Sequence, residues 1–248
     1  MESYSQFAIF YDRLMSDVDY KARTAYLLKL FKKYGKTPTL LLDLACGTGG
    51  FSNEMSRRGI EVIGVDMSEE MLSAARENSA DMGTNVLFLC QKAEDLNLYG
   101  TVDGAICCLD SVNHITNKKN LKKAFEKVSL FLEKDCLFIF DANTVYKHKE
   151  VLGNNTFVIE QDDIYCVWQN CFDEENLVTD ISLDFFAENG DFYERYCEDF
   201  KERAYTDEEL TQMLNDCGFS VEAVLGDMTD SEPDEFCERK IFVAKKIV

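Results

Sequence analysis

The sequence lacks any apolar run near the roughly 20 residues that a membrane-spanning helix requires. Its first 17 residues, MESYSQFAIFYDRLMSD, also lack the basic start and the long apolar stretch of a secretory signal. We therefore expect a cytoplasmic protein in which this N-terminal segment belongs to the mature chain and has a function of its own.

Positive charge is scarce as well. The chain has 248 residues, with 26 lysines and arginines against 46 aspartates and glutamates, so its formal net charge is −20. A field of this sign repels phosphate backbones and anionic lipids, which argues against nucleic-acid and membrane partners. We interpret the acidity mainly as a contribution to solubility, and it says little about the substrate.

Metal-binding and disulfide patterns are missing too. The ten cysteines are scattered without a C-x-x-C pair, and the two histidines, His114 and His148, each stand alone in the sequence. This pattern predicts no metal site. Several cysteines lie in apolar runs, where a reduced thiol behaves as a small hydrophobic side chain. Hydrophobic residues make up 46% of the chain, which is enough to bury a sizeable core.

What the sequence does contain is an alternation of strand and helix signals. Short apolar runs predict five buried strands, at 39–45, 61–66, 85–90, 104–109 and 136–141. Between them, caps and helical spacing predict helices that begin near residues 20, 50, 69 and 117. Strands that alternate with helices imply right-handed crossovers and a parallel sheet covered on both faces. The sequence therefore predicts an α/β, doubly wound fold.

The rhythm changes between residues 151 and 204. Ile181, Leu183 and Phe185 alternate with polar residues, and turn clusters separate about four short strands, as in an antiparallel meander. A capping box at Thr206 then opens a helix, and strands at 219–225 and 240–245 bring the main sheet to seven strands. The predicted units are an N-terminal lid and helix (1–36), a cofactor-binding domain (37–150 and 205–248) and an inserted subdomain (151–204).

The most informative segment is LDLACGTGG at residues 42–50. It leads from a strand through a glycine-rich turn into a helix, and such a turn lets the backbone approach a ligand closely. Asp66 ends the next strand, where its carboxylate can accept hydrogen bonds from both hydroxyls of a ribose. In open α/β sheets ligands bind beyond the carboxyl ends of the strands, so we expect the two features to share one site.

Two classes of cofactor use this arrangement. A dinucleotide fingerprint reads G-x-G-x-x-G, and here Gly47 and Gly49 are followed by Ser52 in the third position. The D-L-A-C that precedes Gly47 resembles instead the first motif of class I S-adenosylmethionine-dependent methyltransferases, an acidic residue and small or apolar residues before G-x-G. VIGVDMSEEML at 62–72 resembles the second strand of that family, and the likeness covers roughly residues 38–145 and 205–247.

The resemblance implies an enzyme with a Rossmann-like methyltransferase fold and S-adenosyl-L-methionine as its cofactor. Asp43 would orient the glycine loop or contact the cofactor's amino group. The other implied cofactor contacts follow the first four strands: Ala45, Cys46, Gly47, Gly49, Asp66, Met67, Ala93, Glu94, Asp95, Leu109 and Asn113. The N-terminal segment resembles the lid of small-molecule methyltransferases, in which Tyr4, Phe7 and Tyr11 would close over the cofactor; packing against the first helix is the alternative.

Methyl transfer requires alignment and exclusion of water more than a catalytic triad, and the sequence shows no triad. His114 or Asp110, after the fourth strand, could take a proton from an amine or hydroxyl acceptor, although a lone histidine is more often structural. We expect a small-molecule acceptor. Candidates to bind it lie in or just after the insertion: Trp168, Arg195, Arg203 (for an anionic acceptor) and Tyr205.

Three alternatives remain open at this point. The inserted strands could form a homodimer interface or a simple cap instead of a substrate-binding wall. The chain could be an NAD(P)-dependent oxidoreductase on a related sheet. It could also be a non-catalytic protein that binds S-adenosylmethionine and acts through a partner.

Overall fold

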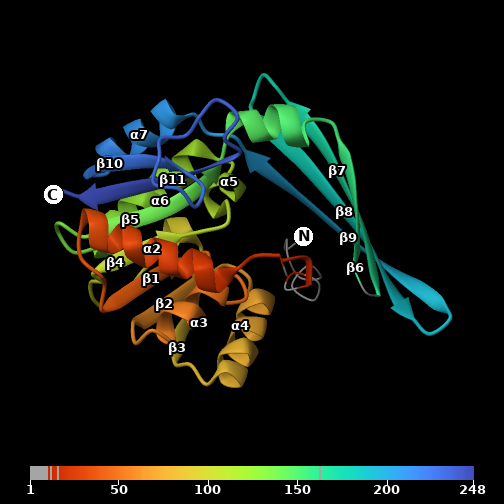
Figure 1. Ribbon diagram of the computed structural model, residues 1–248, viewed down its shortest axis with the longest axis horizontal. Coiled ribbons are helices and arrows are strands. Elements are labelled where there is room, and N and C mark those ends of the chain that lie inside the picture. Colours follow the sequence, from red (N-terminus) through yellow and green to blue (C-terminus); the bar gives the residue numbers. More distant parts are fainter. Residues whose placement is uncertain (1–10, 12, 16, 162) are drawn as a thin grey trace.

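Two β-sheets organise the protein (Figure 1). The computed structural model describes residues 11, 13–15, 17–161 and 163–248. The larger sheet has seven strands in the order β10-β11-β5-β4-β1-β2-β3. Their bounds are β1 Leu40–Leu44, β2 Glu61–Asp66, β3 Val86–Cys90, β4 Gly104–Cys107, β5 Leu137–Asn143, β10 Phe219–Gly226 and β11 Arg239–Lys246. The predicted doubly wound, mostly parallel sheet is confirmed.

The strand order brings the loops after β1, β2 and β4 together at one end of the sheet. β1 pairs in parallel with both β2 and β4, and β4 pairs in parallel with β5, so the chain crosses over after β3 to the other side of β1. β11 runs antiparallel to β5 and β10. Because the carboxyl ends of β1, β2 and β4 meet beside this crossover, the loops that follow these strands converge on a single crevice.

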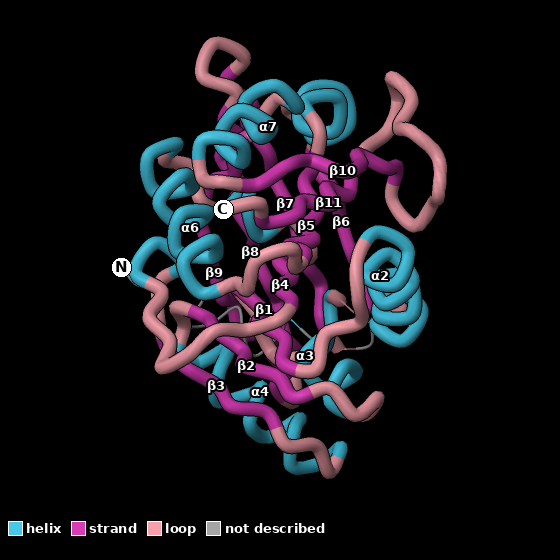
Figure 2. The backbone as a smooth tube through the Cα atoms, turned by 90° about the vertical axis from the view of Figure 1, so that its left-hand side faces the viewer, coloured by secondary structure: helices cyan, strands magenta, loops and turns pink. Residues whose placement is uncertain are grey.

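Helices cover both faces of this sheet (Figure 2). Leu27, Phe31 and Met55 from α2 and α3 pack in one core, and Phe125 and Leu214 from α6 and α7 pack in the other. The helices are α2 Tyr20–Tyr34, α3 Gly50–Ser56, α4 Glu69–Met82, α5 Ser111–His114, α6 Lys118–Phe131 and α7 Asp207–Asp216, with a 3₁₀ turn η1 at Ala93–Asp95. Their starts agree with the predicted ones: Asp19, Ser68, Asn117 and Thr206 each accept a backbone hydrogen bond at a helix start.

The insertion forms the second sheet, which leans away from the first and ends in the projecting β8–β9 hairpin (Figure 1). It is an antiparallel meander in the order β6-β7-β8-β9, with bounds β6 Thr156–Gln161, β7 Ile164–Asp173, β8 Val178–Asn189 and β9 Phe192–Arg203. Short strands were predicted, but β8 and β9 have 12 residues each. The polar clusters between the strands were correctly predicted to be turns. The length of the strands was not, because it depends on pairing with neighbouring strands, which the sequence of one strand does not reveal.

Three short elements were not predicted. They are the 3₁₀ turn η1, the single turn α5 after β4, and η2 Lys147–Leu152, a π-helical turn between β5 and the second sheet. Isolated π-helical turns occur often at functional sites because they place side chains differently from a regular helix. Among the residues described, no helix is both long and apolar enough to cross a membrane.

Candidate functional site

The loop after β1 has the tight geometry expected of a glycine-rich turn. Ala45, Gly47 and Gly49 have φ angles of 57°, 53° and 81°, so each adopts the left-handed conformation that glycine tolerates best. The backbone N–H of Gly47 donates to Asp66 Oδ2 at 2.9 Å. The end of β1 is thereby joined to the end of β2.

Asp66 lies where those two strands end. Its Oδ1 accepts a hydrogen bond from the backbone N–H of Ser68 at 2.9 Å, while Oδ2 accepts the one from Gly47. Burial raises the pKa of Asp66, and these backbone N–H groups partly offset that effect because they stabilise the charged form. Each oxygen keeps a further lone pair, so the carboxylate can still accept hydrogen bonds from a ligand.

Asp43 lies below the loop and not in the crevice. It is almost completely buried, and the hydroxyl of Ser52 donates to its Oδ2 at 2.6 Å. Burial raises the pKa of Asp43 to about 7, and the charge of Asp66 acts in the same direction. Its contacts are therefore those of a residue that supports the glycine loop.

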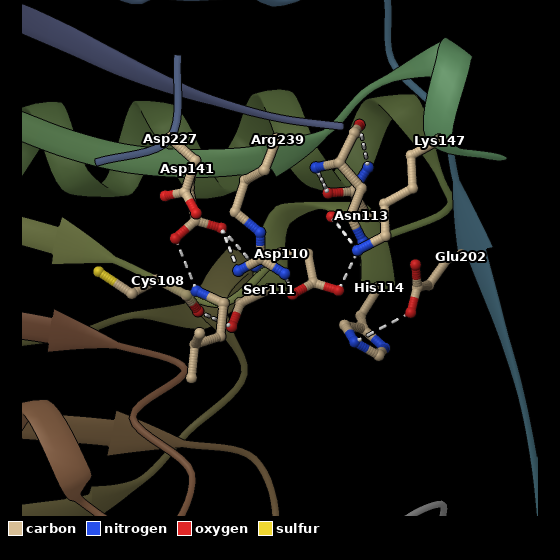
Figure 3. Close-up of polar contacts among 12 residues, drawn as sticks. Cys108, Asp110, Ser111, Asn113, His114, Asp141, Lys147, Glu202, Asp227 and Arg239 are labelled. Carbon is tan, nitrogen blue, oxygen red and sulfur yellow. Dashed lines mark hydrogen bonds and ion pairs between the residues drawn. The ribbon is translucent and has the colours of Figure 1, made fainter. Parts of the chain in front are cut away.

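A buried ionic network holds the loop after β4 (Figure 3). Leu109 and Asp110 have φ angles of 56° and 53°, which is unfavourable for residues other than glycine. Asp141, on β5, accepts the backbone N–H groups of both, at 2.8 and 2.5 Å, and so stabilises this conformation. Arg239 donates to Asp110 at 2.7 Å and to Asp141 at 3.3 Å. Burial disfavours the charged form of Asp110, but Arg239, together with smaller contributions from neighbours such as Lys147 and Asn143, outweighs burial and lowers the pKa of Asp110 to about 2.

His114 ends α5 one turn after Asp110, and its side chain is 28% exposed. Its Nε2 lies 3.5 Å from Oε1 of Glu202, which reaches the crevice from β9 of the second sheet. Figure 3 shows the two side chains facing each other, His114 from α5 and Glu202 from β9. The only two histidines of the chain are therefore not isolated in the fold, because Glu202 lies close to both.

A cavity of about 310 Å³ connects these features. That is near the lower end of the range for small-molecule sites. Eleven of the predicted site residues line it: Tyr11, Ala45, Gly47, Asp66, Met67, Ala93, Glu94, Leu109, Asp110, His114 and Trp168. The remaining lining residues include Leu44, Val65, Met71, Gln91, Ile115, Cys166, Leu183, Phe200 and Glu202. Tyr4 and Phe7 lie outside the described residues.

Eight predicted site residues lie outside the lining of the cavity: Asp43, Cys46, Gly49, Asp95, Asn113, Arg195, Arg203 and Tyr205. Asn113 is fully buried and donates to the carbonyls of Asn143 and Arg203. Asp95 forms an ion pair with Lys123. These contacts are structural and tie elements of the fold together.

The predicted substrate contacts of the insertion need correction. The guanidinium of Arg203 donates to the carbonyls of Thr116 and Asn176, and the hydroxyl of Tyr205 donates to the carbonyl of Ile115. Arg195 is paired with Asp184 on an exposed surface. The cavity receives Glu202 instead of Arg203 because neighbouring residues of a strand point to opposite faces. Tyr196 and Phe200 are partly buried on the same face, and this period-two pattern was the signal for Glu202.

Comparisons with known proteins give one consistent result. A family model described as "Methyltransferase domain" matches residues 41–135. A protein of Bacillus subtilis (strain 168), named "Putative methyltransferase YqeM", is 34% identical over 98% of this chain and 97% of its own length. The crystal structure of an S-adenosylmethionine-dependent methyltransferase from Clostridium acetobutylicum is 33% identical, covers 99% of both chains and has a TM-score of 0.90. The structure of CalS10 from Micromonospora echinaspora, an amino pentose methyltransferase with bound SAM, has the same fold, with 16% identity over 99% and 98% of the chains and a TM-score of 0.77.

Proposed function

The chain belongs to the S-adenosylmethionine-dependent methyltransferases, and from this membership we propose that its cavity binds the cofactor at Asp66 and a small, non-anionic acceptor beside His114. The protein is an enzyme, and S-adenosyl-L-methionine is its cofactor. The matches do not favour the NAD(P)-dependent oxidoreductase. The acceptor and the residues that contact it are the subject of the proposal.

The residues at the ends of β1 and β2 fit an adenosyl group. Gly47 has a left-handed backbone, and among the described residues only the ring of Tyr11, at 3.9 Å, lies near the position of an added Cβ, so a ligand can approach its backbone closely. Asp66 is held by two backbone N–H groups and faces the cavity, as a ribose-binding carboxylate requires. Met67 and Ala93 line the same end, where we place the adenine.

The charge of the cavity carries the proposal. The carboxylates of Asp66, Glu94, Asp110 and Glu202 line it, and no lysine or arginine does so within the described part of the chain. Such a site attracts a sulfonium and repels the pyrophosphate of a dinucleotide. It also repels an anionic acceptor, which removes the role predicted for Arg203. We infer that the acceptor is neutral, or is an amine that arrives as an ammonium ion.

The acceptor would lie between α5 and the second sheet. His114 and Phe200 form one wall, with ring centroids 5.2 Å apart, and Trp168 and Leu183 from the second sheet extend the apolar lining. This wall supports a substrate-covering role for the insertion. The apolar side chains exclude water and hold an organic acceptor in line, and alignment of this kind can lower the barrier by about 7–11 kcal/mol.

The residues would then act as follows. When bound, the cofactor supplies a methyl group on a positively charged sulfur; a nucleophile attacks the methyl carbon in line, and the sulfur leaves as the neutral thioether. His114 takes the proton that an ammonium acceptor must lose before its nitrogen has a lone pair for the attack, or the proton that a neutral amine or a hydroxyl loses as its bond to the methyl carbon forms. Asp110 stays ionised and paired with Arg239, so it is not the group that takes the proton.

The test uses purified protein, S-adenosylmethionine and a panel of acceptors, with S-adenosylhomocysteine release as the readout. The panel contains matched pairs that differ by one carboxylate, for example an aryl or alkyl amine and its carboxylated analogue. We expect turnover with neutral or amine members and a loss of about tenfold or more in kcat/KM for their carboxylated partners. Equal or better turnover of the carboxylated members would refute the proposed acceptor class without affecting the methyltransferase assignment.

A further inference from the structure

Both histidines of the chain converge on one buried carboxylate. His114 Nε2 lies 3.5 Å from Glu202 Oε1, and His148 Nε2 lies 3.7 Å from Glu202 Oε2. His114 borders the cavity, whereas His148 is fully buried. Glu202 therefore lies between a histidine that faces the acceptor and one that never meets solvent.

The fold holds His148 in this position from two directions. It belongs to the π-helical turn η2, which directly follows β5. Its Nδ1 lies 2.8 Å from the Thr179 hydroxyl, and Thr179 is the cross-strand partner of Glu202 in the β8–β9 ladder. The imidazole of His148 thus lies between two paired residues, with Nδ1 near Thr179 and Nε2 near Glu202.

The second contact is incomplete as a hydrogen bond. Among the described residues, neither His148 Nε2 nor Glu202 Oε2 has a hydrogen-bond partner, and both atoms are buried. Leaving both groups unsatisfied would be costly, and the atoms that could satisfy each other are already 3.7 Å apart. Because 3.7 Å is only slightly longer than a hydrogen bond, one proton shared between the two atoms is the simplest way to satisfy both.

The protonation states follow from burial. Burial lowers the pKa of His148 to about 4, so its ring is neutral near pH 7 and carries one N–H. Burial also raises the pKa of Glu202, and the positive charge of Lys147, with that of His114 once it has taken a proton, opposes that rise. If the Thr179 hydroxyl donates to Nδ1, the single N–H of His148 is on Nε2 and points at Glu202.

We propose that Glu202 is the positioning residue of the methyl-transfer site: one of its oxygens orients His114, and the other is held by the Nε2–H of His148. The inference rests on the proposed function of the cavity. As the acceptor bonds to the methyl carbon, its proton moves to His114, and the new positive charge lies beside the Glu202 carboxylate. No proton has to pass to His148. The role of His148 is to hold the Glu202 side chain in place and to keep its carboxylate charged.

A metal ion is the competing explanation for this cluster. One ligand atom from each of Asp110, His114 and Glu202 lies within 4.8 Å of the other two. Arg239, however, is 2.7 Å from Asp110 and already neutralises it, which disfavours a divalent cation at the same carboxylate. The observations therefore favour the hydrogen-bonded arrangement, and metal binding becomes an outcome of the test.

The first measurement needs no acceptor. The chain has only two histidines, so ¹⁵N spectra of the histidine rings, recorded with bound S-adenosylhomocysteine, resolve both, and a His148→Gln variant assigns them. We expect His148 to be neutral with its proton on Nε2 from about pH 5 to about pH 8. In Glu202→Leu the Nε2–H loses its acceptor, and the proton should move to Nδ1, where Thr179 can accept it.

Glu198→Gln is the matched control, because Glu198 is another buried glutamate four residues earlier on the same face of β9. It should leave the His148 tautomer unchanged. A wild-type His148 with its proton on Nδ1, or a tautomer that is the same in Glu202→Leu, would overturn the proposal. Binding of Mn²⁺ or Zn²⁺, each added alone, at the cluster of Asp110, His114 and Glu202 would also overturn it, if that binding is lost in Glu202→Leu.

The second measurement is kinetic and uses the best acceptor of the panel. Glu202→Gln should lower kcat by about 10- to 1,000-fold, with the KM for S-adenosylmethionine and the Kd for S-adenosylhomocysteine changed by less than about twofold. A kcat that stays near the wild-type value would overturn the positioning role. If no acceptor of the panel reacts, the proposed acceptor class is refuted. The histidine spectra alone then test whether Glu202 accepts the Nε2–H of His148.

Discussion

Replacing Asp43 by asparagine is expected to stabilise the protein at about pH 8 far more than at about pH 5. Asp43 is only 2% exposed, and its side-chain partner is the Ser52 hydroxyl at 2.6 Å. Burial, reinforced by the charge of Asp66, raises its pKa to about 7 from an ordinary value of 3.8. The folded protein therefore resists ionisation of this group more than the unfolded chain does.

The magnitude follows from that shift. A carboxyl group with a raised pKa contributes its full stabilisation below pH 3.8, and this contribution is lost as the pH rises through about 7. At about 1.4 kcal/mol per pKa unit the complete shift corresponds to about 4 kcal/mol, of which about 2–3 kcal/mol falls between pH 5 and pH 8. Asparagine has no proton to lose, so it removes this pH dependence while it keeps an oxygen for Ser52.

Urea unfolding of the wild type and of Asp43→Asn, at several values from about pH 5 to about pH 8, measures the effect. All other groups titrate in both proteins, so the difference between their unfolding free energies isolates Asp43. We expect that difference to shift by about 2–3 kcal/mol in favour of the variant as the pH rises. A difference that stays constant within about 0.5 kcal/mol would refute the assignment of a protonated Asp43.

Three further predictions concern the same edge of the sheet. Asp66→Ala should weaken S-adenosylhomocysteine binding by about 10- to 150-fold in titration calorimetry, and a loss well under tenfold would exclude its ribose role. Gly64→Ala should destabilise the protein by about 1–3 kcal/mol in thermal unfolding, because the new Cβ would lie 2.7 Å from the Phe88 ring; an unchanged melting temperature would contradict this packing. Arg239→Leu should cost about 3–5 kcal/mol near neutral pH, since it leaves Asp110 buried without its cation. Burial raises the pKa of Asp110, but Arg239 and smaller contributions from neighbours such as Lys147 together lower it to about 2, so this stabilisation is present above pH 3.8 and is lost as the pH falls through 2. Chemical unfolding that shows the same loss at every pH would contradict it.

Predictions that depended on local chemistry agree with the structure. The helix starts followed from side chains that cap their own helix, such as Ser68 and Thr206, and these contacts span only a few residues. Apolar runs bounded by glycine predicted the central strands, because a strand buried on both faces needs apolar residues throughout. Gly47 and Asp66 were placed in one site because parallel strands that pair must end at the same edge.

Predictions that depended on long-range packing were less accurate. Arg203 was expected in the cavity, but Glu202 lies there, because one residue of register decides which face of β9 a side chain occupies. Asp110 was considered as a base, yet Arg239, 129 residues later, lowers its pKa. The two histidines were treated as isolated because nothing near either of them in the sequence indicates that a single glutamate on a distant strand lies beside both.

The sequence by itself determined the alternation of strands and helices, the glycine loop that precedes α3 and the carboxylate that ends β2. It also determined the resemblance to S-adenosylmethionine-dependent methyltransferases, because each of these features is written within a few consecutive residues. Only the tertiary structure decided which charges line the cavity and which are neutralised behind it. The physical reason is that burial and ion pairing arise between strands far apart in the chain, and these interactions set the protonation states on which the chemistry of the site depends.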